Sequence, residues 1–204
     1  EALAATFAER YPDAVPQGFV VLALGKHGSR ELNYSSDIDP ILLYDPTTLP
    51  HGEREDVADA TVRIGRRVSE ILNARDGDGY VFRVDLRLRP SPEATPIALP
   101  VEAAIGYYES TAMGWEQAAF IRARPAAGDM ALGEYFLRQI RPFVWRRSLD
   151  FGAIDAITDI SRRIRDHYAQ GQPFGPGYDL KRGRGGIREV EFFAQVHQLI
   201  HGGR

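Results

Sequence analysis

The sequence predicts an α+β fold in which a small mixed sheet with helices comes first and a helical domain follows. Two short apolar runs, Phe19–Leu24 and Ile38–Tyr44, are bounded by glycine or proline and are typical of buried strands. Helical spacing of apolar residues dominates the second part of the chain. We therefore expect one domain over residues 1–128 and a helical domain over residues 129–204.

Further elements are predicted around these two runs. Apolar residues recur at intervals of three and four over residues 53–74, which predicts an amphipathic helix. Strict alternation of charged and apolar residues over Tyr80–Leu88 predicts a strand with one apolar and one charged face. Residues 100–121 have the pattern of one or two helices.

The residue pattern in the second part of the chain predicts two helices joined by a connector. An apolar stripe at helical spacing consists of Ile154, Ile157, Ile160, Ile164 and Tyr168. A connector rich in glycine and proline follows at residues 171–186. A last helix is predicted from about residue 187 to residue 201.

Composition places the chain among globular proteins and excludes several functional classes. The 204 residues carry a formal net charge of −3 and include no cysteine, so disulfide frameworks and thiolate metal sites are excluded. No apolar run approaches the roughly 18 residues of a membrane span, and the dispersed arginines do not form a nucleic-acid-binding pattern. We expect a soluble, cytoplasmic protein that binds neither membrane nor nucleic acid.

Two aspartates at the start of the second apolar run are the first candidates for a functional site. Asp37 and Asp39 are two residues apart, so in a strand their side chains point to the same face. Carboxylates aimed at one spot repel each other unless a proton or cation intervenes, and hard oxygen ligands favour magnesium or manganese. Asp85, on the charged face of the alternating run, could complete a set that holds two ions about 3.5 to 4 Å apart. A solvated strand end is the alternative for an Asp-x-Asp pair by itself.

The loop before these aspartates favours a functional site over a solvated strand end. Gly25 and Gly28 allow close approach of the backbone to an anion. Lys26 is one of only two lysines among the 25 basic residues. Hydroxyl groups are available from Ser29, Ser35 and Ser36. The order departs from the P-loop pattern, which requires Gly-Lys-Ser/Thr at the start of a helix.

These residues resemble a known superfamily and, within it, one family. The segment from Gly25 to Asp39, together with Asp85, is similar to the nucleotidyltransferase superfamily of DNA polymerase β, whose pattern is Gly-Gly/Ser, a spacer and Asp-x-Asp/Glu. A closer resemblance, to the glutamine synthetase adenylyltransferase/adenylyl-removing enzymes, extends from about Phe19 to Arg204. Three strings carry it: GKHGSRELNYSSDID, RVDLRLRP and GGIREVEFFAQVHQLIHGGR.

Enzymes of this family have two related nucleotidyltransferase halves, and the chain resembles the amino-terminal, adenylyl-removing half. The shared features are Arg188-Glu189, the string from Gln198 to Arg204, Phe143–Arg147 and Asp150-Phe151. The resemblance implies that inorganic phosphate attacks the AMP phosphorus on the modified tyrosine of adenylylated glutamine synthetase and releases ADP. The alternatives are adenylyl transfer from ATP to that tyrosine, and a non-catalytic module that binds a nucleotide or a signalling protein.

The resemblance also implies roles for individual residues and partners. Asp37, Asp39 and Asp85 would be the catalytic residues and the ligands of two Mg²⁺ ions. Contacts with nucleotide and phosphate would come from Gly25, Lys26, Ser35 and Ser36. The bound groups would be ADP or ATP and inorganic phosphate, and a PII-type signalling protein would act through a longer chain.

Four further residues have both a functional and a structural interpretation. Arg83 and Arg87 lie on the charged face beside Asp85, where they would neutralise phosphate or only balance charge. Lys181 precedes a glycine-rich turn and a helix N-terminus, which suits either a phosphate-sensing lid or a plain linker. Glu189 falls on the apolar stripe of the last helix and needs a partner, either an arginine of its own domain or the active site.

Three positions depart from the family pattern, namely His27 and Ser29 in the loop and Pro40 after Asp39. His27 is interpreted either as a donor beside phosphate or as an incidental loop residue. Pro40 has no backbone donor, which favours the start of a strand over its interior.

Overall fold

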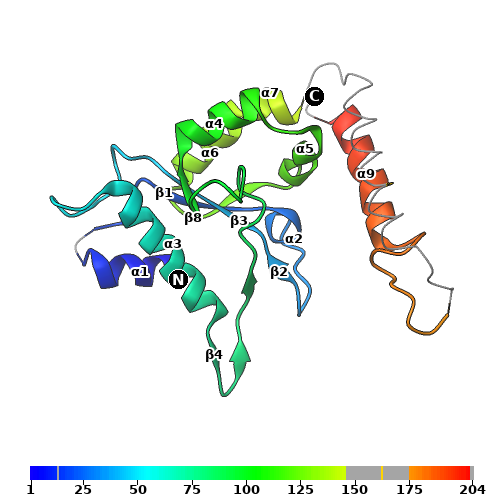
Figure 1. The fold of residues 1–204 in the computed structure, drawn as a ribbon, viewed down its shortest axis with the longest axis horizontal. Helices are drawn as coiled ribbons and strands as arrows, with labels where there is room; N and C mark the ends of the chain where they lie inside the picture. Colours follow the sequence, from blue (N-terminus) through cyan, green and yellow to red (C-terminus); the bar gives the residue numbers. More distant parts are fainter. Residues whose placement is uncertain (13, 146–161, 163–174, 203–204) are drawn as a thin grey trace. The chain divides into compact units, whose positions relative to one another are not determined.

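A computed structural model describes residues 1–12, 14–145, 162 and 175–202, and it divides into two compact units (Figure 1). Unit 1 comprises Glu1–Ala112 and Arg122–Ile140, and unit 2 comprises Met113–Ile121 and the chain from Arg141 onward. The contacts therefore group the chain differently from the predicted segments 1–128 and 129–204. The predicted stripe from Ile154 to Tyr168 lies outside the described residues.

A four-stranded mixed sheet forms the centre of unit 1. Its strands, in spatial order, are β7 (Ala98–Pro100), β3 (Pro40–Tyr44), β1 (Phe19–Ala23) and β8 (Arg124–Gly128). β1 pairs antiparallel with both β3 and β8, and β7 runs parallel to β3. The apolar run at Phe19–Leu24 is confirmed as a central strand, because both of its edges are paired and four of the five residues of β1 are buried.

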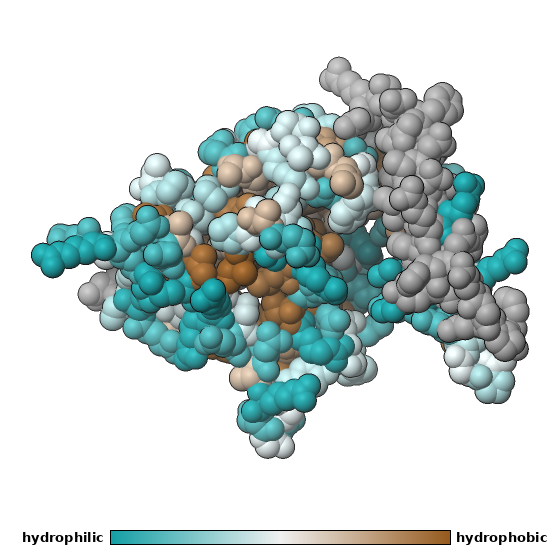
Figure 2. All heavy atoms as spheres, in the orientation of Figure 1, coloured by the Kyte–Doolittle hydropathy of each residue, from teal (hydrophilic) through white to brown (hydrophobic). Residues whose placement is uncertain are grey.

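Helices cover both faces of this sheet (Figure 1). On one face lie α1 (Ala2–Arg10) and α3 (Val57–Asn73), and on the other lie α4 (Val101–Ser110) and α6 (Met130–Gln139). α3 confirms the predicted amphipathic helix, and its N-terminus is capped by the Asp56 carboxylate. The core beneath α1 and α3 includes Phe7, Phe19 and Ile64, all at most 1% exposed. Apolar side chains remain visible at the surface between α3 and the loop that follows α2 (Gly25–Gly28) (Figure 2).

The second apolar run is divided into two strands at Asp39. β2 (Asp37–Ile38) leaves the main sheet and pairs in parallel with β6 (Arg83–Val84), whereas β3 begins at Pro40. Pro40 occupies the first position of a strand, as its missing N–H predicts.

The prediction of a continuous strand over Tyr80–Leu88 is wrong. β5 (Gly79–Tyr80) forms a hairpin with β4 (Arg75–Asp76), and only β6 continues into a second pairing. After β6, Oδ1 of Asp85 accepts the backbone N–H of Arg87 at 3.0 Å. This local bond closes a turn, so the backbone stops pairing although the side chains still alternate.

Unit 2 contains three described helices, α5 (Gly114–Phe120), α7 (Arg141–Val144) and α9 (Ile187–His201). α4 and α5 together confirm the helices predicted over residues 100–121, and α9 confirms the last predicted helix. Phe192, Val196 and Leu199 of α9 pack with Ala118 of α5. None of the helices in the described part of the chain is long and apolar enough to cross a membrane.

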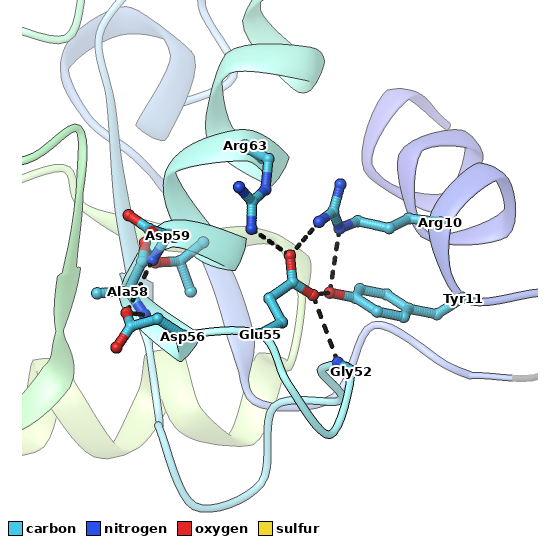
Figure 3. A network of polar contacts seen from close by, with 9 residues as sticks. Arg10, Tyr11, Gly52, Glu55, Asp56, Ala58, Asp59 and Arg63 are labelled. Atoms are coloured by element: carbon cyan, nitrogen blue, oxygen red, sulfur yellow. Dashed lines mark hydrogen bonds and ion pairs between the residues drawn. The ribbon is translucent and has the colours of Figure 1, made fainter.

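A polar network joins the end of α1 to the segment that leads into α3 (Figure 3). The Glu55 carboxylate accepts hydrogen bonds from the guanidinium groups of Arg10 and Arg63 and from the Tyr11 hydroxyl at 2.9 Å. The backbone N–H of Gly52 donates to it at 3.4 Å. Partial burial by itself would raise the pKa of Glu55, but the hydrogen bonds from Arg63, Tyr11 and Arg10 together lower it to about 2.

Replacing Glu55 by glutamine should lower the free energy of unfolding near pH 7 by about 1 to 2 kcal/mol. The pKa shift from 4.5 to about 2 corresponds to about 3 kcal/mol, and solvent screens part of it. Because the folded carboxyl has the lower pKa, this stability is present above about pH 4.5 and is lost as the pH falls toward 2. Urea unfolding of both proteins near neutral pH and near pH 3 measures the difference.

Glu9→Gln is the matched control, because Glu9 pairs with Arg67 at the exposed surface. It should change stability much less. An equal loss in the two variants would contradict the role given to Glu55.

Candidate active site

The pairing of β2 with β6 brings the predicted aspartates onto neighbouring backbone segments. In this parallel ladder Asp37 lies opposite Arg83 and Ile38 lies opposite Val84. The backbone N–H of Asp85 then donates to the Ile38 carbonyl at 2.9 Å, so the ladder extends one step further. Ile38 is buried and Asp37 is exposed, which separates an apolar face of the ladder from a charged one.

Two arginines are the counter-ions of this charged face. Arg83 donates to the Asp37 carboxylate through Nε, and to the Ser35 carbonyl and hydroxyl oxygens at 2.6 and 3.3 Å. Nε of Arg87 lies 2.9 Å from each carboxylate oxygen of Asp85. The hydrogen bond from Arg87 lowers the pKa of Asp85. The pKa values of both arginines are raised, chiefly by their bonds to Asp37 and Asp85.

Arg87 bonds to Asp85 and is also within reach of the charges of Asp39 and Asp37. The charges of Asp39 and Asp37 add to that of Asp85 in raising the pKa of Arg87. In the part of the chain that the structure describes, no three carboxylate or imidazole groups form a ready metal site. Asp37 and Asp85 are instead paired with arginines. A divalent cation would replace these arginines as counter-ion, and the carboxylate oxygens suit Mg²⁺ in their chemistry.

The loop after β1 brings Gly25 close to Asp39. Gly25 begins α2 with a φ of +53°, a conformation that favours glycine. A Cβ atom at this position would lie 3.9 Å from Oδ2 of Asp39. The next side chain in the loop, Lys26, is partly buried. The loop therefore approaches the Asp39 carboxylate from the end of the central strand.

Several other loop residues that the sequence assigns to anion binding have structural partners. A Cβ atom at Gly28 would lie 1.9 Å from the Arg122 carbonyl oxygen, so packing alone requires glycine there. The Ser29 hydroxyl donates back to a carbonyl of α2 at 3.2 Å. Ser36 Oγ accepts the backbone N–H of Asn33 at 3.2 Å. These contacts hold the loop in shape.

Tyr80 belongs to the site, although no sequence pattern identified it as a site residue. Its hydroxyl accepts a hydrogen bond from Arg83. The guanidinium carbons of Arg75 and Arg83 lie 5.3 and 5.6 Å from the centre of its ring. Its hydrogen bond with Ser35, followed by the charges of the two arginines, lowers the pKa of Tyr80. The available signal, a tyrosine three residues before Arg83, is too common to be specific.

Lys181 and Glu189 lie in unit 2, in the turn before α9 and in the first turn of α9. Oδ1 of Asp179 accepts the backbone N–H groups of Lys181 and Arg182, both at 2.9 Å. Oε2 of Glu189 accepts the backbone N–H of Gly185, also at 2.9 Å. The glycine-rich turn is therefore organised by carboxylates at both ends.

The chain is similar to known proteins over most of its length. The family model described as glutamate-ammonia ligase adenylyltransferase matches residues 2–139, and the model described as GlnD PII-uridylyltransferase matches residues 158–204. A bifunctional glutamine synthetase adenylyltransferase/adenylyl-removing enzyme of Rhizobium meliloti is 54% identical over 187 residues, covering 92% of this chain and 19% of that protein.

Two more relatives carry the same name. The protein of Caulobacter vibrioides is 54% identical over 187 residues, covering 92% of this chain and 19% of its own length. That of Rhodopseudomonas palustris is 50% identical over 198 residues, covering 95% of this chain and 20% of its own length. The chain spans about a fifth of the length of the curated relatives it matches. Because the first family model covers more than half of the chain, including all three aspartates, the chain belongs to the glutamate-ammonia ligase adenylyltransferase family.

Proposed function

We propose that unit 1 is a polymerase-β-like nucleotidyltransferase domain that removes the adenylyl group from glutamine synthetase by phosphorolysis. The observation that carries this proposal is the pairing of β2 with β6, which places Asp37 and Asp85 on neighbouring backbone segments, while Asp39 lies beside the loop that begins at Gly25. Membership of the family and the names of the relatives support adenylyl chemistry on glutamine synthetase. The mixed sheet with helices on both faces suits such a domain.

In this proposal the three aspartates hold Mg²⁺, two ions in all, and the bound metal supplies neutralisation of the phosphate charges. Arg83 and Arg87, released from their carboxylates, would bind the phosphate oxygens of the nucleotide, because guanidinium groups match phosphate geometry. Phosphate contacts would also come from Gly25, Lys26, Ser35 and Ser36.

The chemical step needs positioning more than it needs a strong base. An oxygen of inorganic phosphate attacks the AMP phosphorus, and the bond from that phosphorus to the tyrosine oxygen breaks. ADP is released, and the tyrosine oxygen takes up a proton. Because the attacking phosphate is already an anion near neutral pH, orientation and charge neutralisation would supply most of the reduction in the barrier.

The removing direction is supported by sequence features rather than by the site itself. Arg188-Glu189 and the string from Gln198 to Arg204 resemble the amino-terminal half of the family's enzymes. The match of residues 158–204 to the GlnD PII-uridylyltransferase model supports a PII-type signalling protein as a regulatory partner of the longer protein. Addition of AMP from ATP is the alternative direction.

Incubating the chain with adenylylated glutamine synthetase, Mg²⁺ and inorganic phosphate should release ADP. Asp37→Asn should slow this release by about 100-fold or more, as expected when a group that stabilises transition-state charge is lost. Asp78→Asn, an exposed aspartate in the β4–β5 hairpin, is the matched control. Incorporation of AMP from ATP without ADP release would contradict the proposed direction. Nucleotide binding without either reaction would indicate a non-catalytic module.

Replacing Arg83 by glutamine should tighten Mn²⁺ binding to the nucleotide-free chain and weaken ADP binding. The guanidinium competes for Asp37 in the free protein and, in the proposal, binds phosphate in the complex. We expect changes of about 3- to 10-fold in opposite directions, the small effect expected for a charge pair that solvent screens. Electron paramagnetic resonance and calorimetry measure the two affinities. Arg66→Gln, at an exposed position of α3, is the control, and a change of both affinities in the same direction would contradict the assignment.

Lys181→Ala should raise the phosphate concentration needed for half-maximal ADP release by about 10-fold, the loss expected for one hydrogen bond to a charged group. Thermal stability should stay unchanged, because the Lys181 side chain is exposed. Arg182→Ala, the neighbouring exposed cation, is the control. An unchanged phosphate requirement would leave this turn as a plain linker.

A further inference from the structure

Two histidines lie one turn apart on the side of α9 that faces away from its packed face. Phe192, Val196 and Leu199 pack on α5 and hold the helix in place within unit 2. Successive residues of a helix are about 100° apart around its axis, so His197 and His201 fall on the opposite side. Both side chains are exposed, which opens their rings to ions from solvent.

The two imidazole rings are already arranged as a pair. Their centres lie 6.0 Å apart, and their planes are nearly parallel, with 10° between them. The ring of Phe193, one turn before His197, packs edge-on against it with 4.6 Å between ring centres. This contact restricts the rotation of the His197 ring on the side away from His201. The remaining freedom of the two rings therefore lies toward each other.

Histidines at this spacing suit the coordination of one metal ion. Residues four apart are neighbours on the surface of a helix, and helical H-x-x-x-H strings bind Zn²⁺ in this way. Zinc–nitrogen bonds of about 2.0 to 2.1 Å in tetrahedral geometry place the two nitrogens roughly 3.3 Å apart. The two rings therefore need to approach each other by about 1 Å, which rotation about their side-chain bonds provides.

We propose that His197 and His201 bind one Zn²⁺ ion, with one nitrogen from each ring and water in the other positions. Imidazole suits Zn²⁺, whereas Mg²⁺ prefers oxygen ligands, so this site differs in chemistry from the candidate active site. His201 lies in the last turn of α9, where the helix dipole favours a cation. Binding here does not rest on the proposed function.

The ligand set also determines what the bound ion does. Structural zinc sites use four protein ligands, so two histidines give reversible binding. Gln198 occupies the place of the glutamate base in the hydrolytic string H-E-x-x-H, so the ion binds without that activity. An ion held by two successive turns ties the last turn of α9 to the turn before it. Zn²⁺ would therefore stabilise the C-terminal end of this helix.

Titration of the isotopically labelled chain with Zn²⁺, followed through the imidazole signals, tests the proposal. We expect the signals of His197 and His201 to shift along one saturation curve, because both rings bind the same ion. Mg²⁺ should leave both signals unchanged. Hydrogen exchange of the backbone amides in the last turn of α9 should slow when Zn²⁺ is bound. Separate saturation of the two rings, or equal shifts with Mg²⁺, would overturn the proposal and leave the proposed function untouched.

Variants test whether the spacing of the histidines determines the affinity. His201→Gln should weaken Zn²⁺ binding at His197 by about 100-fold, because the second contact within the same chain is lost. Adding Gln198→His to this variant restores the number of histidines at positions about 100° apart on the helix, so binding should stay weak. His51→Gln removes an exposed histidine whose Nδ1 lies 3.0 Å from the Leu49 carbonyl oxygen, and this matched control should bind like the unchanged chain.

Circular dichroism verifies that each variant is folded. Unchanged Zn²⁺ affinity in a folded His201→Gln, or affinity restored by Gln198→His, would overturn the proposal. An affinity that increases with the concentration of the chain would overturn it as well, because the ion would then bridge two chains.

Discussion

The parallel pairing of β2 with β6 is the constraint on which the candidate site depends. It joins residues 46 positions apart in the chain, and it places Asp37 beside Arg83 and Asp85 beside Ile38. The register is fixed by burial, because Ile38 is only 3% exposed. A slip of one residue would turn Ile38 to solvent and Asp37 into the core, which is energetically prohibitive.

Arginines are the counter-ions of two carboxylates on the charged face of this ladder. Neighbouring carboxylates repel one another, and Arg83 and Arg87 relieve that repulsion through pairs that remain partly exposed to solvent. Such pairs contribute little to stability, because solvent screens their charges. They are strong enough to order the aspartates and weak enough for a ligand of higher charge to replace them. A buried ion pair could not be exchanged in this way, because breaking it would strand an uncompensated charge.

Side-chain periodicity correctly predicted the elements whose apolar residues are buried in the core. The central strand at Phe19 and the amphipathic helix α3 were predictable, because their apolar residues pack on one core. The alternation from Tyr80 to Leu88 failed, since it carries no information about a pairing partner or about the turn that Asp85 makes with Arg87. The strand therefore ends where the local hydrogen bond between Asp85 and Arg87 replaces the hydrogen bonds between strands.

The candidate site was predictable to a similar degree. The spacing of Asp37 and Asp39 and their order with Asp85 were sufficient to identify the three carboxylates, whose role as metal ligands stays a prediction. The packing of Gly28 on the Arg122 carbonyl could not be predicted, because it joins segments far apart in the sequence. The contact of Tyr80 with Arg83 depends on the orientation of two side chains, which no sequence pattern specifies.

The ionisable groups around the site also determine how it responds to acidity. The pKa of Asp85 is lowered and those of Arg83 and Arg87 are raised, so all three move away from neutrality. The pKa of His27 is lowered as well, whereas that of Tyr80 moves downward from 10.0 toward neutrality. Between about pH 7 and pH 9 the aspartate, the arginines and the histidine keep one charge state. A phosphate group, whose second ionisation lies near pH 6, also keeps one charge state over most of this range, so acidity would change the charge of a phosphate ligand below the range rather than within it.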